Sequence, residues 1–168
     1  MRHFIMACFL AVVSIVSAQD NNSPVSINGE PMIIGHTTYE NILNHFDDWR
    51  AVADTVTVDS AVVQQFKAIR EPVHILLFLG TWCGDSRRGV PPFMAVFRAA
   101  NNPNLKLDII GVTRDKEDPE GLASRYGIER VPTFVILKDG KEIARLVEFP
   151  QKTFAQDFIE VLTKPESE

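Results

Sequence analysis

Residues 73–86 read VHILLFLGTWCGDS, and this stretch decides the fold. Its first half, Val73–Leu79, is a continuous apolar run that is too short for a free-standing helix. Such a run is typical of a strand buried in a sheet with both faces covered. A helix is expected to follow the Cys83 loop and to reach about Ala100. Because sites in such sheets collect at the carboxyl ends of strands, the loop around Cys83 is the first candidate for a functional site.

Two helices are predicted before this strand. Thr37 and Glu40 form a capping-box pattern that opens a stretch with apolar residues at helical spacing. A second helical stretch begins near Asp59 and ends before Pro72. Ahead of both, the apolar patch Met32–Ile34 is predicted to be an edge strand.

The sequence after Ala100 predicts strands and helices in alternation. Asp139 and Gly140 give a strong hairpin-turn signal between two strands. The elements expected here are a buried strand at Leu105–Val112, a short helix at Pro119–Tyr126, hairpin strands at Phe134–Leu137 and Glu142–Val147, and an amphipathic helix at Thr153–Leu162. This order implies an α/β fold in which helices cover a central mixed sheet.

The composition is that of one globular domain. The chain has 168 residues, is 45% hydrophobic and 23% charged, and contains no internal repeat or linker-like tract. Its formal net charge of -5 and its scattered basic residues give little support to nucleic-acid binding.

The chain begins with the features of a secretory signal peptide. Arg2 and His3 precede the apolar run Phe4–Val16, and small residues follow up to Ala18. The run is shorter than the roughly 20 residues that span a bilayer, so cleavage after Ala18 is expected rather than stable membrane insertion. The protein is therefore predicted to be exported, to the periplasm or the extracellular space. Its predicted parts are a signal peptide (1–18), an N-terminal extension with helices packed on the domain (19–71) and the main domain (72–168).

Cleavage removes Cys8 and leaves Cys83 as the one cysteine of the mature chain. Exported domains usually pair their cysteines in disulfides, so a single thiol is either buried and inert or kept for reactivity. Cys83 lies in a glycine-containing polar loop rather than on an apolar stripe. The reactive interpretation is therefore favoured.

Several spaced motifs resemble those of the thioredoxin family. Trp82–Ser86 (WCGDS) is similar to the family's Trp-Cys-Gly-Pro-Cys active site, and Pro91 stands where thioredoxins kink the active-site helix. Tyr126–Thr133 (YGIERVPT) is similar to the family's segment that ends in a cis-proline and a threonine. The resemblance covers roughly residues 72–163. It implies a thioredoxin fold, with a central mixed β-sheet flanked by helices on both faces and, here, an N-terminal helical extension.

Cys83 is the expected catalytic residue, with Ser86 beside it. A cysteine at the start of a helix faces unpaired backbone N–H groups and the positive end of the helix dipole, which favours the thiolate, the nucleophile of disulfide exchange. Ser86, one turn on, is expected to donate a hydrogen bond to the same sulfur. The neighbours predicted to modulate the sulfur, through the charge of two arginines and an opposing aspartate, are Gly84, Asp85, Arg87 and Arg88.

The resemblance also implies a substrate-binding surface. Pro132 is expected to be cis and to pack beside Cys83, which leaves the backbone N–H and C=O of Val131 to pair with an extended peptide. Thr133 follows in the same motif, and Trp82 is expected to be partly exposed on the docking surface.

Three positions depart from the thioredoxin pattern. Ser86 replaces the second, resolving cysteine, and Leu77 stands where thioredoxins keep a buried aspartate that assists the resolving step. Glu148 stands near the end of the last strand, where a glycine is usual. The dithiol cycle that ends in an internal disulfide is therefore closed to this chain.

One-thiol chemistry remains. The leading hypothesis is a monothiol thiol–disulfide oxidoreductase or isomerase that forms mixed disulfides between Cys83 and exported proteins with exposed disulfides or thiols. Release would come from the client's own second thiol or from an external thiol reductant. The alternative is a non-catalytic peptide-binding or client-tethering module that uses the same groove.

Other classes have less support. A glutaredoxin-like role is disfavoured because no Gly-Gly-containing glutathione loop follows Pro132. His36, His45 and His74 lack metal-ligand spacing, so no metal and no cofactor are predicted. The charged run Arg114–Asp118 is predicted to be a solvated loop.

Overall fold

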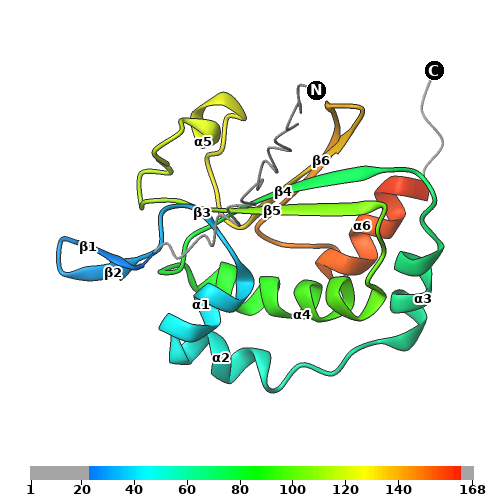
Figure 1. Ribbon diagram of the computed structural model, residues 1–168, viewed down its shortest axis with the longest axis horizontal. Helices are drawn as coiled ribbons and strands as arrows, with labels where there is room; N and C mark the ends of the chain where they lie inside the picture. The colour runs from blue at the N-terminus through cyan, green and yellow to red at the C-terminus, as the bar shows by residue number, and fades with distance from the viewer. Residues whose placement is uncertain (1–22, 164–168) are drawn as a thin grey trace, which may run out of the picture.

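A computed structural model describes residues 23–163, which form two sheets and six helices (Figure 1). The predicted signal peptide, residues 1–18, lies outside the described residues. The strands are β1 (Val25–Ile27), β2 (Glu30–Met32), β3 (Gly35–Thr37), β4 (Val73–Leu79), β5 (Leu105–Gly111), β6 (Thr133–Lys138) and β7 (Lys141–Val147). The helices are α1 (Tyr39–His45), α2 (Asp47–Ala53), α3 (Ser60–Ala68), α4 (Gly84–Ala100), α5 (Leu122–Arg125) and α6 (Phe154–Thr163).

The main sheet has its strands in the order β3-β5-β4-β6-β7. The central strand β4 pairs in parallel with β5 along its whole length and antiparallel with β6. β3 and β7 form the two edges, with antiparallel pairings to β5 and β6. The mixed sheet predicted from the sequence is confirmed. The apolar run of β4 follows from its central position, where both faces of the strand are covered.

Helices cover the two faces of this sheet unequally. Figure 1 shows α1–α4 and α6 on one side of the sheet and the short α5 on the other. The first side holds the larger core, with a cluster of phenylalanine rings at its centre: Phe66, Phe93, Phe134 and Phe158. Burying each such ring contributes about 2–3 kcal/mol to the stability of the fold. Trp82 and Cys83 pack against the smaller core, on the α5 side.

The helical region before β4 is divided more finely than the sequence predicts. Thr38, rather than Thr37, caps α1, because its side chain accepts a hydrogen bond from the Asn41 N–H at 3.1 Å. Phe46 has an extended backbone and separates α1 from α2. The helix predicted from Asp59 is confirmed as α3, with Asp59 as its N-cap.

The edge strand lies later in the chain than predicted. The patch Met32–Ile34 ends the separate β1–β2 hairpin and leads into the true edge strand, β3. Ile33 is fully buried, and its backbone crosses the end of β5 closely: a Cβ on Gly111 would lie 2.1 Å from the Ile33 carbonyl oxygen. That approach requires a glycine. Within the patch, Met32 pairs with Val25 in the hairpin, whereas Ile33 is apolar because it is buried where the chain crosses the end of β5.

The helix that follows the Cys83 loop, α4, runs for 17 residues and contains Pro91 and Pro92. It follows the Cys83 loop and ends at Ala100, which confirms the predicted helix that reaches about Ala100. Neither α4 nor any other helix within residues 23–163 combines the length and the apolar character needed to cross a bilayer.

Candidate functional site

The loop between β4 and α4 is held by the N-terminal part of the chain. Thr81 is buried there, and its hydroxyl accepts a hydrogen bond from the Ile33 N–H at 3.3 Å. The Thr81 carbonyl accepts a second bond, from the indole N–H of Trp49 in α2 at 2.9 Å. The Cys83 N–H donates to the Gly80 carbonyl at 2.9 Å, which tightens the turn. These bonds fix the place where α4 begins.

Cys83 is a free, half-buried cysteine at the N-cap position of α4. Its carbonyl accepts the first hydrogen bond of the helix, from the Arg87 N–H at 3.0 Å. Its Sγ atom donates to the Val131 carbonyl oxygen at 3.3 Å. The Val131–Pro132 peptide bond is cis, as the resemblance implies. The fold therefore brings Cys83 and the Val131–Pro132 segment together across 48 positions of sequence.

A short network holds the Val131–Pro132 segment. Thr133 is buried, and its hydroxyl donates to the Arg130 carbonyl at 2.7 Å. From the end of β7, the Glu148 N–H donates to the Pro132 carbonyl at 2.8 Å. Glu148 has a φ of +50°, a backbone conformation that glycine adopts most readily, which accounts for a glycine being usual here. In this chain a 3.0 Å ion pair between Glu148 and Arg130 accompanies that backbone.

Trp82 lies half-buried against the smaller core, next to Cys83 in the chain. Its indole N–H donates to the Val112 carbonyl at 3.0 Å, just beyond the end of β5. The ring covers Gly80, where a Cβ would lie 2.5 Å from the Trp82 Cε2 atom. The predicted partial exposure of Trp82 is confirmed, and its ring is held rigidly.

Ser86 faces the protein interior rather than the sulfur. Its side chain is fully buried, and its hydroxyl accepts a hydrogen bond from the Gly80 N–H at 3.4 Å. The predicted hydrogen bond to Cys83 is wrong, because the face of α4 that carries Ser86 and Val90 packs on the sheet. Leu77 of β4 is also fully buried, so an apolar side chain occupies the place of the usual aspartate.

The two arginines of the first turn of α4 are paired with carboxylates. Arg87 forms an ion pair with Asp48 of α2, and Arg88 forms one with Asp85 of the same turn. Arg88 also lies close to Gly84, where a Cβ would be 3.2 Å from its Nη1 atom. The positive charge predicted from these arginines is therefore balanced locally.

Arg114 is a residue of the site that the sequence pattern does not reveal. Its guanidinium Cζ lies 4.6 Å from the centroid of the Trp82 ring, and two 2.8 Å hydrogen bonds join it to the Glu30 carboxylate. The hydrogen bond from Arg114 holds the pKa of Glu30 below its ordinary value, and the same bond raises the pKa of Arg114. Arg114 and Glu30 are 84 positions apart, so no local signal predicts the pair.

The three histidines of the described residues lie apart from one another. His74 Nε2 is 2.7 Å from an Asp108 carboxylate oxygen, which agrees with a structural role. His36 lies 3.4 Å from Glu120, and the His45 ring is 2.9 Å from a carbonyl of its own helix. Within residues 23–163 no group of three or more histidine, cysteine or acidic side chains is placed to hold a metal ion.

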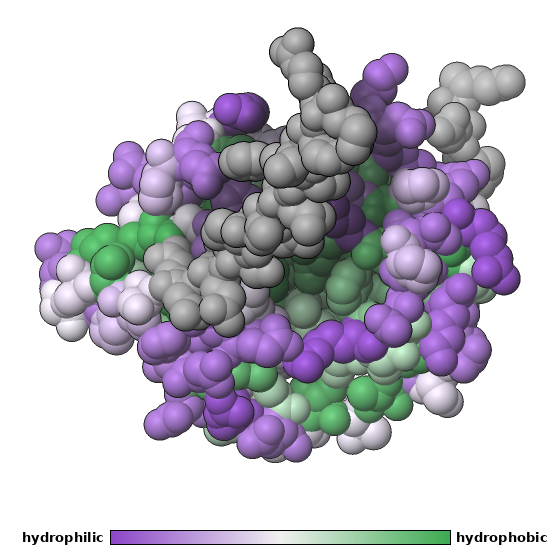
Figure 2. All heavy atoms as spheres, in the orientation of Figure 1, coloured by the Kyte–Doolittle hydropathy of each residue, from purple (hydrophilic) through white to green (hydrophobic). Residues whose placement is uncertain are grey.

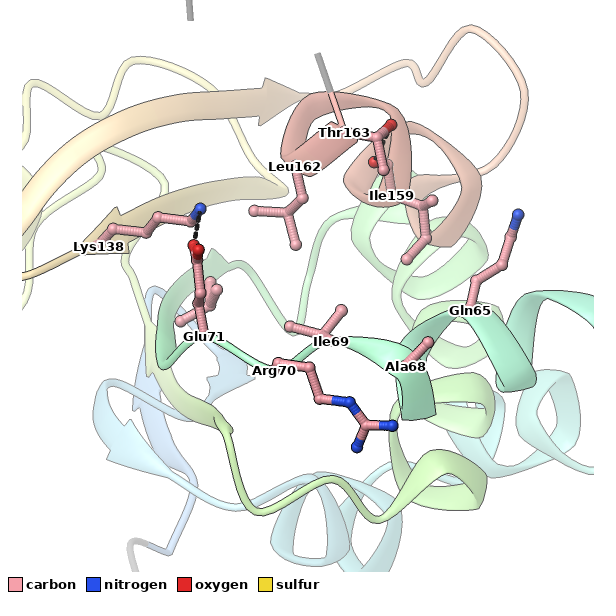
Figure 3. A pocket seen from close by; sticks show the side chains of 10 residues that line it. Gln65, Ala68, Ile69, Arg70, Glu71, Lys138, Ile159, Leu162 and Thr163 are labelled. Atoms are coloured by element: carbon pink, nitrogen blue, oxygen red, sulfur yellow. Dashed lines mark hydrogen bonds and ion pairs between the residues drawn. The ribbon is translucent and has the colours of Figure 1, made fainter. Parts of the chain in front are cut away.

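A hollow of about 460 Å³ lies at the opposite end of β4 from the site. Figure 3 shows its apolar lining residues Ile69, Ile159 and Leu162, with the Lys138–Glu71 ion pair at one side. The length of β4 separates the hollow from the Cys83 loop by about 20 Å. It therefore forms no part of the site.

The thioredoxin family model matches residues 36–162. The chloroplastic thioredoxin Y2 of Arabidopsis thaliana is 43% identical over 93 residues, which cover 51% of this chain and 52% of that protein. Thioredoxin 1 of Synechococcus elongatus is 33% identical over 103 residues, which cover 61% of this chain and 90% of that protein. The chain thus spans about half the length of the Arabidopsis relative.

Among solved structures, a Pseudomonas aeruginosa protein of unknown function is similar to this chain, with a TM-score of 0.59. The alignment covers 76% of this chain and 92% of that one at 16% identity, a likeness of fold alone. The family match, by contrast, runs from β3 to α6 and includes both the Cys83 loop and the Val131–Pro132 segment. The chain belongs to the thioredoxin family.

Proposed function

We propose that this thioredoxin-family protein is a monothiol thiol–disulfide oxidoreductase or isomerase that acts on exported proteins through a mixed disulfide at Cys83. The observation that carries the proposal is the position of the sulfur, half-buried at the N-terminus of α4 and 3.3 Å from the Val131 carbonyl beside a cis-proline. A helix N-terminus offers unpaired N–H groups and a positive potential to an anion. The identity of the clients as exported proteins rests on the predicted signal peptide, residues 1–18.

The reaction begins with attack of the Cys83 thiolate on one sulfur of a client disulfide. A sulfur–sulfur bond forms between Cys83 and that atom while the client's own disulfide bond breaks. The second client sulfur leaves as a thiolate and takes up a proton from solvent. Because one disulfide replaces another, this step involves no net oxidation or reduction.

Release requires a thiol from outside this chain. When a different thiol of the same client attacks the client sulfur of the mixed disulfide, Cys83 leaves as a thiolate and the client carries a rearranged disulfide, which is isomerisation. When an external thiol attacks the client sulfur instead, Cys83 leaves in the same way and a second external thiol completes the reduction. Ser86 takes no part, because a hydroxyl forms no disulfide and this one is bonded in the interior.

An extended client segment would pair with the backbone of Val131. The Val131 carbonyl already lies at the Cys83 sulfur, and the bonds of Thr133 and Glu148 hold the segment from both sides. The half-buried ring of Trp82 adds a rigid apolar surface next to Cys83. These features support a client strand docked beside the reacting sulfur.

The experiment is to trap the mixed disulfides. The full chain is produced in an exporting bacterial host, free thiols are blocked with iodoacetamide at lysis, and covalent partners are identified by mass spectrometry after non-reducing electrophoresis. We expect partners joined to Cys83 that disappear on reduction and are missing from the matched control, Cys83→Ser. A wild-type protein without partners, or the same partners with Cys83→Ser, would contradict the proposal.

A client-tethering module is the second candidate, and it is favoured by the absence of an internal resolving group. Ser86 and Leu77 leave the buried side of the site without a second thiol or a carboxylate. The two candidates differ in turnover. With glutathione as the external thiol, an isomerase should accelerate the refolding of a protein with scrambled disulfides, whereas adducts without acceleration identify a tether.

A further inference from the structure

Arg114 brings a cation to the site from a loop that is closed by backbone hydrogen bonds. The Thr113 N–H donates to the Glu117 carbonyl at 3.0 Å, and the Lys116 N–H donates back to the Thr113 carbonyl at 3.0 Å. The loop therefore closes on itself directly after the strand β5. The closed loop fixes the backbone from which the Arg114 side chain extends.

The guanidinium of Arg114 is held from two sides. Its distance of 4.6 Å from the Trp82 ring centroid is within the range of a cation–π contact. Its Nε and Nη2 atoms each donate to a Glu30 carboxylate oxygen at 2.8 Å, a bidentate geometry that fixes the guanidinium plane. The cation is therefore anchored on Trp82, the residue that directly precedes Cys83 in the chain.

Glu30 belongs to the β1–β2 hairpin, which stands apart from the main sheet. Figure 1 shows this hairpin projecting from the body of the protein, and Figure 2 shows apolar side chains gathered over it, where Val25 is exposed. The chain leaves the hairpin into Ile33, whose N–H bonds to Thr81 in the Cys83 loop. The hairpin thus reaches the site through the Glu30 carboxylate, and the residue that follows it bonds to the Cys83 loop.

The charge of Arg114 interacts with the Cys83 sulfur. The Glu30 hydrogen bond is the largest cause that raises the pKa of Arg114; partial desolvation opposes it, and the charges of Glu30 and Cys83 raise it further. A coupling between two charged groups is reciprocal. Cys83 and Trp82 also pack against the same small core, so the guanidinium on the Trp82 ring and the sulfur belong to one cluster.

Most other charged side chains near Cys83 form ion pairs with an opposite charge, and two further ones lie at the edge of the site. The pairs come from α4 with α2, from within α4, and from the two loops beside Pro132: Arg87 with Asp48, Arg88 with Asp85, and Arg130 with Glu148. Lys116 lies 6.0 Å from the Trp82 centroid, and Glu129 is exposed before the Val131 segment. Arg114 differs from Lys116 in lying closer to the Trp82 centroid, at 4.6 Å, and from the paired arginines in contacting the ring beside Cys83.

We propose that Arg114, stacked on Trp82 and held by Glu30, is a positioning residue that stabilises the Cys83 thiolate, and that the β1–β2 hairpin sets the strength of this stabilisation. The inference rests on the proposed role of Cys83 as the reacting group and adds the cation that tunes it. Glu30 acts in two opposing ways, because its carboxylate holds the guanidinium in place and also neutralises part of its charge.

The test is the pH dependence of Cys83 alkylation by iodoacetamide, in a Cys8→Ser background that leaves one thiol in the chain. Arg114→Gln should slow alkylation near neutral pH about threefold to tenfold and move the rate profile to higher pH. Glu30→Gln should move the profile to lower pH, because the amide oxygen still accepts from Arg114 while the negative charge is gone.

Arg98→Gln is the matched control. Arg98 pairs with Glu40 at 3.0 Å and is 53% exposed, against 57% for Arg114, but it lies in the last turn of α4. Its substitution should leave the alkylation profile unchanged. The control therefore disrupts an arginine–glutamate ion pair of similar exposure that lies away from the Cys83 sulfur.

Opposite shifts with Arg114→Gln and Glu30→Gln support the proposal. Coincident profiles for all variants, or a shift with Arg98→Gln as large as that with Arg114→Gln, would overturn it. If Arg114→Gln does not fold by circular dichroism, the direction of the Glu30→Gln shift decides. Adduct trapping is a separate result. Opposite shifts without adducts support this inference and contradict the proposed function. Adducts together with coincident profiles support the proposed function and contradict this inference.

Discussion

Ser86 is the side chain that separates this site from a dithiol site. It follows Cys83 by one helical turn, and residues three apart on a helix have Cβ atoms about 5–6 Å apart, from which two cysteines can bridge after a small adjustment. Serine places a smaller hydroxyl at this position and offers no second sulfur. In the proposed reaction the lifetime of a mixed disulfide at Cys83 is therefore set by outside thiols.

Ser86→Cys is expected to convert the site to dithiol chemistry. A second thiol in the same turn attacks a mixed disulfide as an intramolecular nucleophile, so the adduct lifetime should shorten by roughly tenfold or more. The measurement is the decay of a preformed mixed disulfide between Cys83 and a chromogenic thiol, with wild type as control. A second measurement counts free thiols after mild oxidation of the double variant Cys8→Ser, Ser86→Cys. Two free thiols there, together with an unchanged adduct lifetime, would refute this expectation.

Tyr39 of α1 carries a buried hydroxyl without a hydrogen-bond partner in the part of the chain that the structure describes. Burial, opposed in part by Arg98, raises the pKa of Tyr39 from 10 to about 12. The unfolded chain therefore ionises first, and the free energy of unfolding falls as the pH rises from 10 to about 12.

Tyr39→Phe is expected to remove the contribution of this group to alkaline destabilisation. It should also raise the free energy of unfolding at neutral pH by up to about 1 kcal/mol, because the hydroxyl no longer has to be desolvated. Urea unfolding of wild type and variant across the alkaline range measures both effects. An identical alkaline decline in the two proteins would speak against the assignment.

At the residue scale, the sequence predicts the site residues that can be recognised from their neighbours along the chain. Cys83 and Pro132 belong to motifs of fixed spacing, and the structure brings them together as the thioredoxin resemblance implies. The direction of Ser86 is not predictable in this way, because the core decides which face of α4 is buried. The same holds for Arg114, whose partner Glu30 comes from a distant hairpin.

At the element scale, α4 ends where Asn101 adopts a left-handed backbone, with φ 44° and ψ 47°. Glycine adopts this conformation without the steric cost of a Cβ, whereas a β-branched residue tolerates it poorly. Since Asn101 is exposed, Asn101→Gly should stabilise the fold by about 0.5–1 kcal/mol, and Asn101→Val should destabilise it by about 1–2 kcal/mol. Chemical unfolding measures both changes, and the reverse order of stability would disprove the argument.

Long elements with a clear pattern are predictable, and short connections are not. The extents of β4 and α4 agree with the sequence, because a long apolar run and a helix with one buried face carry their own signals. The patch Met32–Ile34 carries no such signal, because three apolar residues are compatible both with an edge strand and with a buried segment that crosses the end of another strand. The break at Phe46 is likewise invisible, since the apolar spacing continues through it.

At the scale of the whole molecule, the N-terminal part and the main sheet share one core. α2 and α3 pack on α4, and α3 also packs on α6. The fold class could be predicted from motifs within residues 72–163, but this docking could not, because it depends on contacts between distant residues such as Ile33 and Gly111. The boundary between residues 71 and 72 stays a prediction.

Gly111→Ala is expected to disrupt that docking. The added Cβ would lie 2.1 Å from the Ile33 carbonyl oxygen, a backbone atom that has to move with its chain, so we expect a loss of about 2 kcal/mol or more. Gly127→Ala serves as the control, since open space surrounds its Cβ position and the cost is about 1 kcal/mol for its left-handed backbone alone. Denaturant midpoints compare the two, and equal losses would argue against a close crossing.

Both tryptophans of the chain form indole hydrogen bonds that involve the reactive loop: Trp49 donates to the Thr81 carbonyl in the loop, and Trp82, itself in the loop, donates to the Val112 carbonyl after β5. Indole emission responds to the polarity and hydrogen bonding of its surroundings. For the proposed reaction this predicts an optical reporter built into the protein: attachment of a client to Cys83 should change the intrinsic fluorescence, so that capture and release can be timed in a stopped-flow instrument without any dye.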